Sequence, residues 1–353
     1  MNLPSTTKAY AALAPTTPLQ PYNLERRPLG THDVAITIEY CGVCHSDLHQ
    51  VRNEWGGAIY PMVPGHEIVG HVKAIGSSVS KFSIGDRVGV GVIVDSCRCC
   101  SACEEHLEQF CEKGASFTYN SMEQDKKTPT YGGYSQEIIT TEDFVLPIPE
   151  NLPLATAAPL LCAGITTYSP LRHWKVGVGQ KVGIIGLGGL GHLGVKFAHA
   201  LGAETYVITT SAHKRTDALQ LGAQGILLSS DSACMAAHAM SFDFILSTIS
   251  AVHHLDDYLK LLKRDGTLVT VGLPPQPLKL DLSSVIHGRK TIAGSMIGGI
   301  QETEEMLKFC GEKNITADIE LIPINEINTA YDRMLRGDVH YRFVIDIASL
   351  GKE

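Results

Sequence analysis

The spacing of apolar residues changes character part-way along the chain. Up to about residue 150, short apolar stretches alternate with polar residues and are separated by Gly and Pro, as at residues 34–38, 68–75 and 87–94. Alternation with a period of two predicts β-strands with one buried face. Because these strands are short and regularly spaced, the first part of the chain is expected to form a compact, β-rich barrel.

From about residue 155 the pattern becomes an alternation of strands and helices. A short apolar strand over 182–185 is followed by a helical pattern over 187–201 and a second strand over 205–208. Helices are also predicted over 212–221 and 254–262, and strands over 226–228, 242–249 and 267–271. Repeated βα units of this length predict an α/β fold, in which a doubly wound parallel sheet carries helices on both faces.

The last segment is expected to return to the barrel. Helical patterns over 302–313 and 327–336 precede a final strand over 342–347. Since this strand can pair with the N-terminal strands, we expect a first domain of residues 1–152 and 295–353. The second domain, residues 153–294, is then an insertion that begins just after Pro147-Ile148-Pro149, where the proline pair marks a boundary.

Composition and charge narrow the class of protein. The 353 residues are 44% apolar and 19% charged, as in a globular protein of two domains. A net charge of −8 argues against nucleic acid or an anionic membrane as a partner. No apolar run approaches the ~18 residues of a spanning helix, and the N-terminus lacks the apolar core of a signal peptide. We therefore expect a cytoplasmic protein with a small-molecule ligand.

Five of the ten cysteines fall within one short window, which predicts a metal site. Clustered cysteines in a long cytosolic chain favour metal binding over disulfides. Four of them can close a tetrahedral zinc shell that leaves no open position, which is typical of a structural site. These are Cys97, Cys100, Cys103 and Cys111, in a lobe over 95–112. Cys99 is out of register and is expected to be a spare thiol.

A second set of zinc ligands surrounds the motif that begins at Cys44. Cys44, His66 and Glu67 bring a thiol, an imidazole and a carboxylate into one short stretch, and Cys162 is the best candidate for a distant third ligand. Three protein ligands with one open position are typical of catalytic zinc. Glu67 could be a ligand itself or could lie behind the metal and shape its field.

Two further side chains in this motif can move a proton. A zinc-bound alcohol must lose its hydroxyl proton, and zinc lowers the pKa of that hydroxyl. Ser46 offers a hydroxyl close to Cys44, and His49 follows at i+3 on a predicted short helix. An imidazole suits proton exchange near neutral pH, so Ser46 and His49 are expected to form a relay.

A glycine-rich turn predicts a dinucleotide site. It follows the strand over 182–185 and opens a helix, the context in which a G-x-G-x-x-G motif cradles pyrophosphate. The loop consists of Gly186, Leu187, Gly188, Gly189, Leu190 and Gly191.

The end of the next strand predicts which dinucleotide binds. An NAD site carries Asp or Glu there to hold the ribose 2′-hydroxyl. This chain has Thr210 and Ser211 instead, followed by Arg215. Hydroxyls and a guanidinium suit a 2′-phosphate, so NADP(H) is the expected cofactor.

With these motifs in order, the chain resembles the zinc-dependent medium-chain alcohol dehydrogenases, specifically the cinnamyl alcohol dehydrogenase branch. The likeness covers nearly the whole sequence. Its motifs include Cys-Gly-Val-Cys-His-Ser-Asp-Leu-His-Gln (41–50), Tyr-Pro-Met-Val-Pro-Gly-His-Glu (60–67), Ala-Ala-Pro-Leu-Leu-Cys-Ala-Gly (157–164) and Tyr-Arg-Phe-Val-Ile-Asp (341–346).

The resemblance implies a GroES-like catalytic domain and a Rossmann domain, with two zinc ions per chain. It assigns the catalytic and structural zinc ligands and the relay as above, and it places Thr166 by the nicotinamide. It also implies a homodimer formed through the Rossmann domains. Plant members carry a tryptophan soon after the last structural cysteine. Here the corresponding region is 114–117, which ends in Phe117, so the substrate is left open.

We therefore expect a zinc oxidoreductase that interconverts primary alcohols and aldehydes, aromatic or medium-chain, with NADP(H). Aldehyde reduction is the expected direction. One alternative is a zinc-dependent polyol or other secondary-alcohol dehydrogenase. Another, from a different class, is a non-catalytic NADPH-binding protein, against which the complete set of ligand and relay residues argues.

Overall fold

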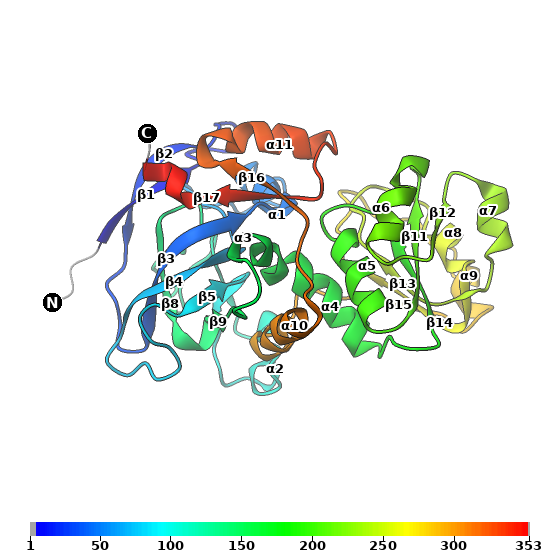
Figure 1. Ribbon diagram of the computed structural model, residues 1–353, viewed down its shortest axis with the longest axis horizontal. Coiled ribbons are helices and arrows are strands. Elements are labelled where there is room, and N and C mark those ends of the chain that lie inside the picture. The colour runs from blue at the N-terminus through cyan, green and yellow to red at the C-terminus, as the bar shows by residue number, and fades with distance from the viewer. Residues whose placement is uncertain (1–4, 352–353) are drawn as a thin grey trace. The chain divides into compact units, whose positions relative to one another are not determined.

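The computed structural model describes residues 5–351 and divides into two compact units (Figure 1). The barrel unit comprises the chain up to Cys162 and again from Gly298, and the parallel-sheet unit comprises Ala163–Ile297. The expected boundaries lay earlier, after residues 152 and 294. Helix α3 (Leu154–Ala157) contacts strands of the barrel, which explains why the first unit extends past the proline pair.

The barrel unit is built on a seven-stranded sheet in the order β16-β17-β3-β4-β5-β9, with β8 also paired to β3. Its C-terminal strand β17 pairs antiparallel with β3, so the last segment of the chain completes the sheet. The strands of this unit are β1 (Ser5–Ala11), β2 (Gln20–Arg26), β3 (Asp33–Gly42), β4 (Ile68–Ile75), β5 (Arg87–Val90), β6 (Ile93–Asp95), β7 (Ser116–Phe117), β8 (Glu137–Thr141), β9 (Leu146–Pro147), β16 (Ile319–Pro323) and β17 (Arg342–Asp346).

Apolar side chains of β3, β4 and β17 form the core of the barrel unit. Val34, Ile36, Ile68 and Val344 are fully buried, and burial of such side chains contributes roughly 1.5–3 kcal/mol each. The helices of this unit are α1 (His45–Val51), α2 (Ser101–Glu104), α3, α10 (Ile300–Lys313) and α11 (Ile327–Leu335).

The predicted strand over 87–94 is two strands in the structure. It breaks at Gly91, because β6 leaves the main sheet and pairs with β7. The Gly91 carbonyl accepts a hydrogen bond from the Thr118 hydroxyl, and the Val92 carbonyl accepts one from the Thr118 N–H. A local apolar pattern cannot reveal this change of partner.

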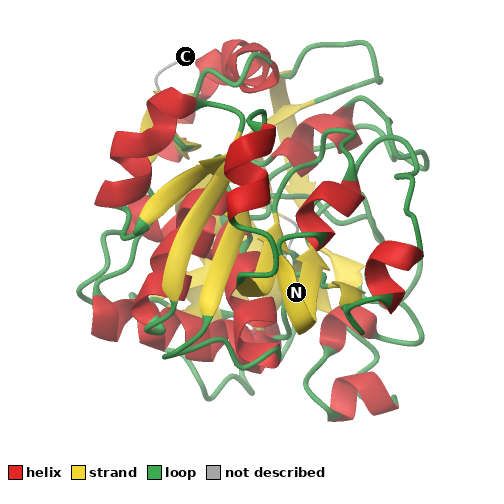
Figure 2. Ribbon diagram, turned by 90° about the vertical axis from the view of Figure 1, so that its right-hand side faces the viewer, coloured by secondary structure: helices red, strands yellow, loops and turns green. Residues whose placement is uncertain are grey.

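The parallel-sheet unit has six strands in the order β12-β11-β10-β13-β14-β15, and every neighbouring pair is parallel. Figure 2 shows helices (red) packed against strands (yellow). Counted within the unit, the order is 3-2-1-4-5-6, that of a Rossmann fold. The α/β class and the doubly wound sheet predicted from the sequence are confirmed. The strands are β10 (Lys181–Ile185), β11 (Glu204–Thr209), β12 (Gly225–Leu228), β13 (Phe242–Ser247), β14 (Leu262–Thr270) and β15 (Thr291–Gly294).

The helices of this unit differ in part from the sequence pattern. The predicted helix over 187–201 begins only at Gly191, because the preceding glycine-rich residues form a loop instead of a first helical turn. Helices α4 (Ala163–His173), α7 (Ser232–Ala237) and α9 (Ser283–Ile286) and strand β15 were not predicted from the pattern. The helices are α4 (Ala163–His173), α5 (Gly191–Ala200), α6 (Arg215–Gln220), α7 (Ser232–Ala237), α8 (Leu255–Leu259) and α9 (Ser283–Ile286).

Within residues 5–351, no single helix is long and apolar enough to cross a membrane. One bent pair, Leu154–Leu161 with Ala163–His173, meets the length and composition criteria together, and its residues are mostly buried.

Candidate active site

Four side chains that can bind a metal converge in the barrel unit. Ligand atoms of Cys44, His66, Glu67 and Cys162 all lie within 4.8 Å of one another. Cys44 is the residue before helix α1, and His66 and Glu67 directly precede strand β4. Cys162 follows the 3-10 turn that begins at Ala158. The structure thus brings together the three expected zinc ligands and Glu67 from distant parts of the chain.

The spacing of these atoms fits a zinc ion. Cys44 Sγ lies 4.0 Å from Cys162 Sγ, and His66 Nε2 lies 3.2 Å from Cys162 Sγ. Two sulfurs bound tetrahedrally at about 2.3 Å from zinc are about 3.8 Å apart. A hydrogen bond from Cys162 lowers the pKa of Cys44, whereas the same contact raises the pKa of Cys162. Without a cation only one of the two thiols ionises readily, and a divalent metal allows both to do so.

Asp47 holds this cluster in place, although sequence reasoning did not single it out. Its buried carboxylate accepts hydrogen bonds from the backbone N–H groups of Cys44, at 2.9 Å, and Gly65, at 3.2 Å. The oxygen that accepts from Gly65, Oδ1, also lies 3.2 Å from His66 Nδ1. That contact places the Nδ1 proton toward Asp47 and leaves Nε2 free to bind metal. Burial lowers the pKa of His66, but Asp47 and Cys44 outweigh it and the net pKa is raised.

Glu67 is held from the other side by Arg342 on β17. Arg342 donates a hydrogen bond from Nη2 to Glu67 Oε1, and both side chains are buried. The second oxygen, Oε2, has no hydrogen-bond partner among the described residues. Burial raises the pKa of Glu67 to about 8, against the opposing charge of Arg342. A buried carboxylate oxygen without a partner, inside a set of ligand atoms, fits a nearby cation.

Glu67 also depends on the small residue at position 42. A Cβ built on Gly42 would collide with Glu67 Oε2. Gly42 is the last residue of β3, where any larger residue would displace the carboxylate. The glycine is therefore needed for the site rather than for the strand.

The two expected relay residues lie on helix α1. Ser46 Oγ lies 3.6 Å from Cys44 Sγ, so the hydroxyl borders the ligand cluster. His49 is 27% exposed, and its Nδ1 lies 2.5 Å from Glu54 Oε2. Glu54 was missed from the sequence because it lies beyond the motif, in a loop whose fold local patterns do not predict.

The four-cysteine lobe forms the second cluster. The Sγ atoms of Cys97 and Cys103 are 3.9 Å apart, and those of Cys100 and Cys103 are 3.5 Å apart. Two backbone N–H groups point at sulfurs, from Cys97 to Cys111 and from Glu112 to Cys100, each at 3.4 Å. N–H donors stabilise thiolates, so the donor set fits a closed zinc shell. Cys99 is exposed and outside the cluster, as expected.

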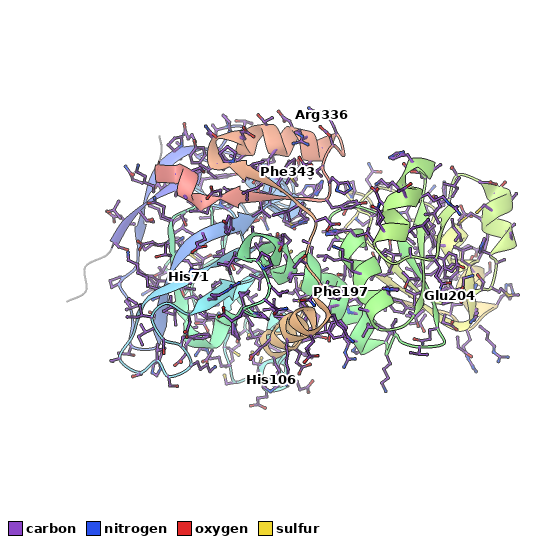
Figure 3. All side chains as sticks on the ribbon, viewed as in Figure 1. His71, His106, Phe197, Glu204, Arg336 and Phe343 are labelled. Carbon is purple, nitrogen blue, oxygen red and sulfur yellow. The ribbon has the colours of Figure 1, made fainter. Side chains whose placement is uncertain are left out.

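The lobe is also tied to helix α10. Glu108 accepts a hydrogen bond from the N–H of Ile300 at 3.0 Å, which satisfies one of the free donors at the start of that helix. Figure 3 labels His106 in this lobe. Its carbonyl is so close to Gly299 that a Cβ on Gly299 would collide with it.

The glycine-rich loop lies between β10 and α5 in the parallel-sheet unit. Gly186 has φ +88°, which favours glycine. A Cβ on Gly191 would collide with the Gly186 carbonyl, so the third glycine allows the helix to start close to the strand. A Cβ added at Gly188 would meet nothing within 4 Å, so the backbone there is open to a ligand. These are the three roles of a dinucleotide-binding loop.

The residues expected to contact a 2′-phosphate follow β11. Thr210 and Arg215 are exposed and Ser211 is half-buried. Lys214 Nζ donates a hydrogen bond to the carbonyl of Leu187 at 2.7 Å, and burial lowers its pKa. Lys214 therefore links this segment to the glycine-rich loop. Thr166 is buried on helix α4 of the same unit.

A closed zinc shell predicts that replacing Cys100 and replacing its neighbour Cys99 have different effects on zinc content and thermal stability. Cys100→Ser should lose one zinc per chain and lower the midpoint of thermal unfolding by at least roughly 5 °C. The expected cause is the loss of metal-binding energy from folding, with ~1 kcal/mol corresponding to about 2–4 °C in a domain of this size. Cys99→Ser is the matched control. Equal zinc content and equal melting of the two variants would contradict a structural site.

The contact between Asp47 and the ligand His66 predicts that Asp47 affects the affinity for zinc. Asp47→Asn should weaken zinc binding at the cluster around Cys44 by ~10–100-fold, because the residue that orients a ligand is changed. Competition with a chromogenic chelator measures the affinity. Tyr134→Phe is the control, since it removes one donor 3.2 Å from Asp47 but keeps the carboxylate. Unchanged affinity in Asp47→Asn would show that His66 does not need this partner.

Comparisons with known proteins agree with this geometry. Residues 30–150 match the alcohol dehydrogenase GroES-like domain, and residues 189–312 match the zinc-binding dehydrogenase family. Aldehyde reductase YahK of Escherichia coli K12 is 57% identical over 97% of this chain and 99% of its own length. A cinnamyl alcohol dehydrogenase structure from Sorghum bicolor matches with a TM-score of 0.95 at 45% identity, covering 98% of both chains. The structure of a Helicobacter pylori cinnamyl alcohol dehydrogenase complexed with NADP(H) matches with a TM-score of 0.92 at 44% identity, covering 98% of this chain and 99% of that one. The chain belongs to the zinc-dependent medium-chain alcohol dehydrogenase family.

Proposed function

We propose that this protein is an aldehyde reductase that converts aldehydes to primary alcohols with NADPH, and that it uses a zinc ion at Cys44, His66 and Cys162. The observation that carries the proposal is the convergence of these three ligands and Glu67 within 4.8 Å. Three ligands leave a position for substrate, as in catalytic zinc sites. Because cells usually hold the NADP pool reduced, reduction is the proposed direction.

When bound, zinc polarises the aldehyde oxygen and the nicotinamide supplies the hydride. The chain's own residues set the conditions for this step. Asp47 orients His66, and Arg342 holds Glu67 at the edge of the ligand set. Glu67 would serve as a fourth ligand when the substrate is absent, which is consistent with its unpartnered Oε2.

The alcohol product needs a proton, and we assign its delivery to Ser46 and His49. Ser46 Oγ borders the cluster and can donate to the product oxygen. His49, one helical turn along, can return a proton to Ser46 and can take one from solvent, because part of its ring is exposed. Glu54 contacts the Nδ1 side of the imidazole and fixes the orientation of the ring.

The cofactor segment supports NADP(H) over NAD(H). No carboxylate occurs between Thr209 and Arg215, where an NAD site needs one. Arg215 is an exposed guanidinium on the first turn of α6, and Thr210 and Ser211 offer hydroxyls beside it. The chain resembles the Helicobacter pylori structure, which is complexed with NADP(H), and this resemblance also supports NADP(H) as the cofactor. Thr166 is proposed to contact the nicotinamide.

Two exposed aromatic side chains are candidates for substrate contacts in the barrel unit. Trp55 is 45% exposed and Phe117 is 38% exposed. Large rings that remain accessible to solvent favour apolar or aromatic aldehydes. We therefore propose a broad preference for such aldehydes rather than for polyols.

We also propose a homodimer in the cytoplasm. Strand β15 is an outer strand of its sheet, and the nearby segment carries three exposed apolar side chains, Leu280, Leu282 and Ile286. An uncovered edge with apolar neighbours favours pairing with a second copy. All ten cysteines are free, and thiol ligands are kept available in a reducing compartment.

The proposed function predicts NADPH-dependent reduction of benzaldehyde and octanal, measured by the loss of nicotinamide absorbance. Cys162→Ser should lower kcat/KM by ~10³-fold or more, since a catalytic metal is worth several kcal/mol. Cys310→Ser, at a buried thiol outside both clusters, should keep the wild-type rate. Turnover of sorbitol but of no aldehyde would contradict the proposal and favour a polyol dehydrogenase.

The cofactor assignment predicts different effects for two neighbouring residues. Arg215→Ala should raise the KM for NADPH roughly tenfold, about 1.4 kcal/mol, and leave that for NADH nearly unchanged. Lys214→Ala should weaken both cofactors, because Lys214 holds the glycine-rich loop. Arg264→Ala, an exposed arginine elsewhere in the unit, is the control. Equal loss for NADPH and NADH in Arg215→Ala would exclude a 2′-phosphate contact.

A further inference from the structure

We propose that Trp55 is a positioning residue of the proton relay, whose indole packs against the His49 imidazole and favours its protonated form. The inference rests on the proposed function for its catalytic meaning, but its structural basis is independent of it. The ring centroids of Trp55 and His49 are 5.1 Å apart, and the ring planes are inclined by 31°. A cation within about 6 Å of an indole centroid is attracted by the negative face of the ring.

The loop after helix α1 explains why Trp55 lies there. Gly56 and Gly57 have φ of +77° and +73°, and a Cβ on either would meet nothing within 4 Å. Both glycines are thus needed for the turn itself and not for space. Asn53 closes the turn by accepting a hydrogen bond from the N–H of Ala58 at 3.0 Å. The loop is therefore a defined structure that presents Trp55 beside α1.

His49 is enclosed by two side chains of this one loop. Glu54 Oε2 lies 2.5 Å from Nδ1, and Trp55 packs against the ring. His45, on the same helix, is the other titratable group that faces His49, at 6.4 Å between ring centroids. The carboxylate and the indole both stabilise an imidazolium, and the indole also removes part of the ring from water, which strengthens the interaction with Glu54.

Exposure supports a role beyond packing. Trp55 is 45% exposed, although tryptophan is among the side chains that gain most from burial. If Trp55 served stability alone, a polar side chain in its place would change the free energy of folding little, because much of the ring is exposed. The ring contact with His49, 5.1 Å between centroids, gives the exposed indole a place beside the relay.

The chain offers a test that does not depend on turnover. It contains two tryptophans, and Trp174→Phe leaves Trp55 as the only indole and removes the background from Trp174, which packs on His173. A protonated imidazole quenches the fluorescence of an adjacent indole. The Trp174→Phe protein should therefore lose fluorescence in one step as the pH falls, and the additional change His49→Gln should abolish that step. A pH-independent emission would overturn the proposed contact, whatever the activity of the enzyme.

Kinetics then test the effect on the relay. In aldehyde reduction the protonated imidazole supplies the proton, so activity falls at the alkaline limb of the pH profile. Trp55→Leu should move that limb of kcat to lower pH by roughly 0.4–0.7 unit, equal to about 0.5–1 kcal/mol. Trp55→Phe keeps an aromatic face and should restore about half of the shift.

Three outcomes separate this proposal from simpler ones. A change of KM for bulky aldehydes with an unmoved pH limb would overturn it and leave Trp55 as a substrate contact only. A limb that moves equally in Trp55→Leu and Trp55→Phe would overturn the aromatic argument. Absence of turnover in the wild-type protein would refute the proposed function, while the fluorescence step would still decide whether Trp55 senses the charge on His49.

Discussion

The site depends on one buried carboxylate. Asp47 lies within hydrogen-bonding distance of the backbone of Cys44 and Gly65, the ring of His66 and the hydroxyl of Tyr134. These partners come from the start of α1, the loop before β4 and the segment before β8. A buried charge is costly unless every partner is in place, so the carboxylate makes the arrangement cooperative. If one of these segments moved, Asp47 would lose donors and His66 would lose its orientation.

The two metal clusters solve different physical problems with the same chemistry. The lobe uses four thiols, and two backbone N–H groups point at their sulfurs. That shell is closed, so its binding energy goes into holding a loop that has little apolar core of its own. The cluster around Cys44 instead mixes thiols with an imidazole, and it is supported from behind by Asp47 and Arg342. Its rigidity comes from the protein, and ligation by Cys44, His66 and Cys162 would leave one position on a bound metal free for chemistry.

Much of this could be predicted from the sequence because spacing carries the information. Four cysteines in fifteen residues can hardly do anything other than bind metal, and G-x-G-x-x-G after an apolar strand has one common use. The rest depends on tertiary contacts that no local pattern contains. Arg342 and Glu67 are 275 residues apart in the sequence. They meet because β17 pairs with β3. Asp47 looks like any polar residue in a short helix, and Glu54 reaches His49 because the chain turns back after α1, where the Glu54 N–H donates to the His49 carbonyl. Lys214 stands beside Arg215 in the sequence, but its ammonium donates a hydrogen bond to the Leu187 carbonyl, a contact that no local pattern predicts.

The charges of the site explain why a separate proton path is needed. Two thiolates would balance a divalent cation, Arg342 lies against Glu67 and the buried Asp47 carboxylate lies against His66. A change of protonation at one of these buried, paired groups would leave its partner's charge without a counter-charge, which is expensive at this depth. We therefore expect the proton for the product to come from outside the ligand set, through a group that can change its charge near water. His49 meets that requirement because its ring is partly exposed and faces Glu54. In the proposed relay, the loop that carries Glu54 and Trp55 contributes to catalysis together with the ligands, because both side chains contact His49.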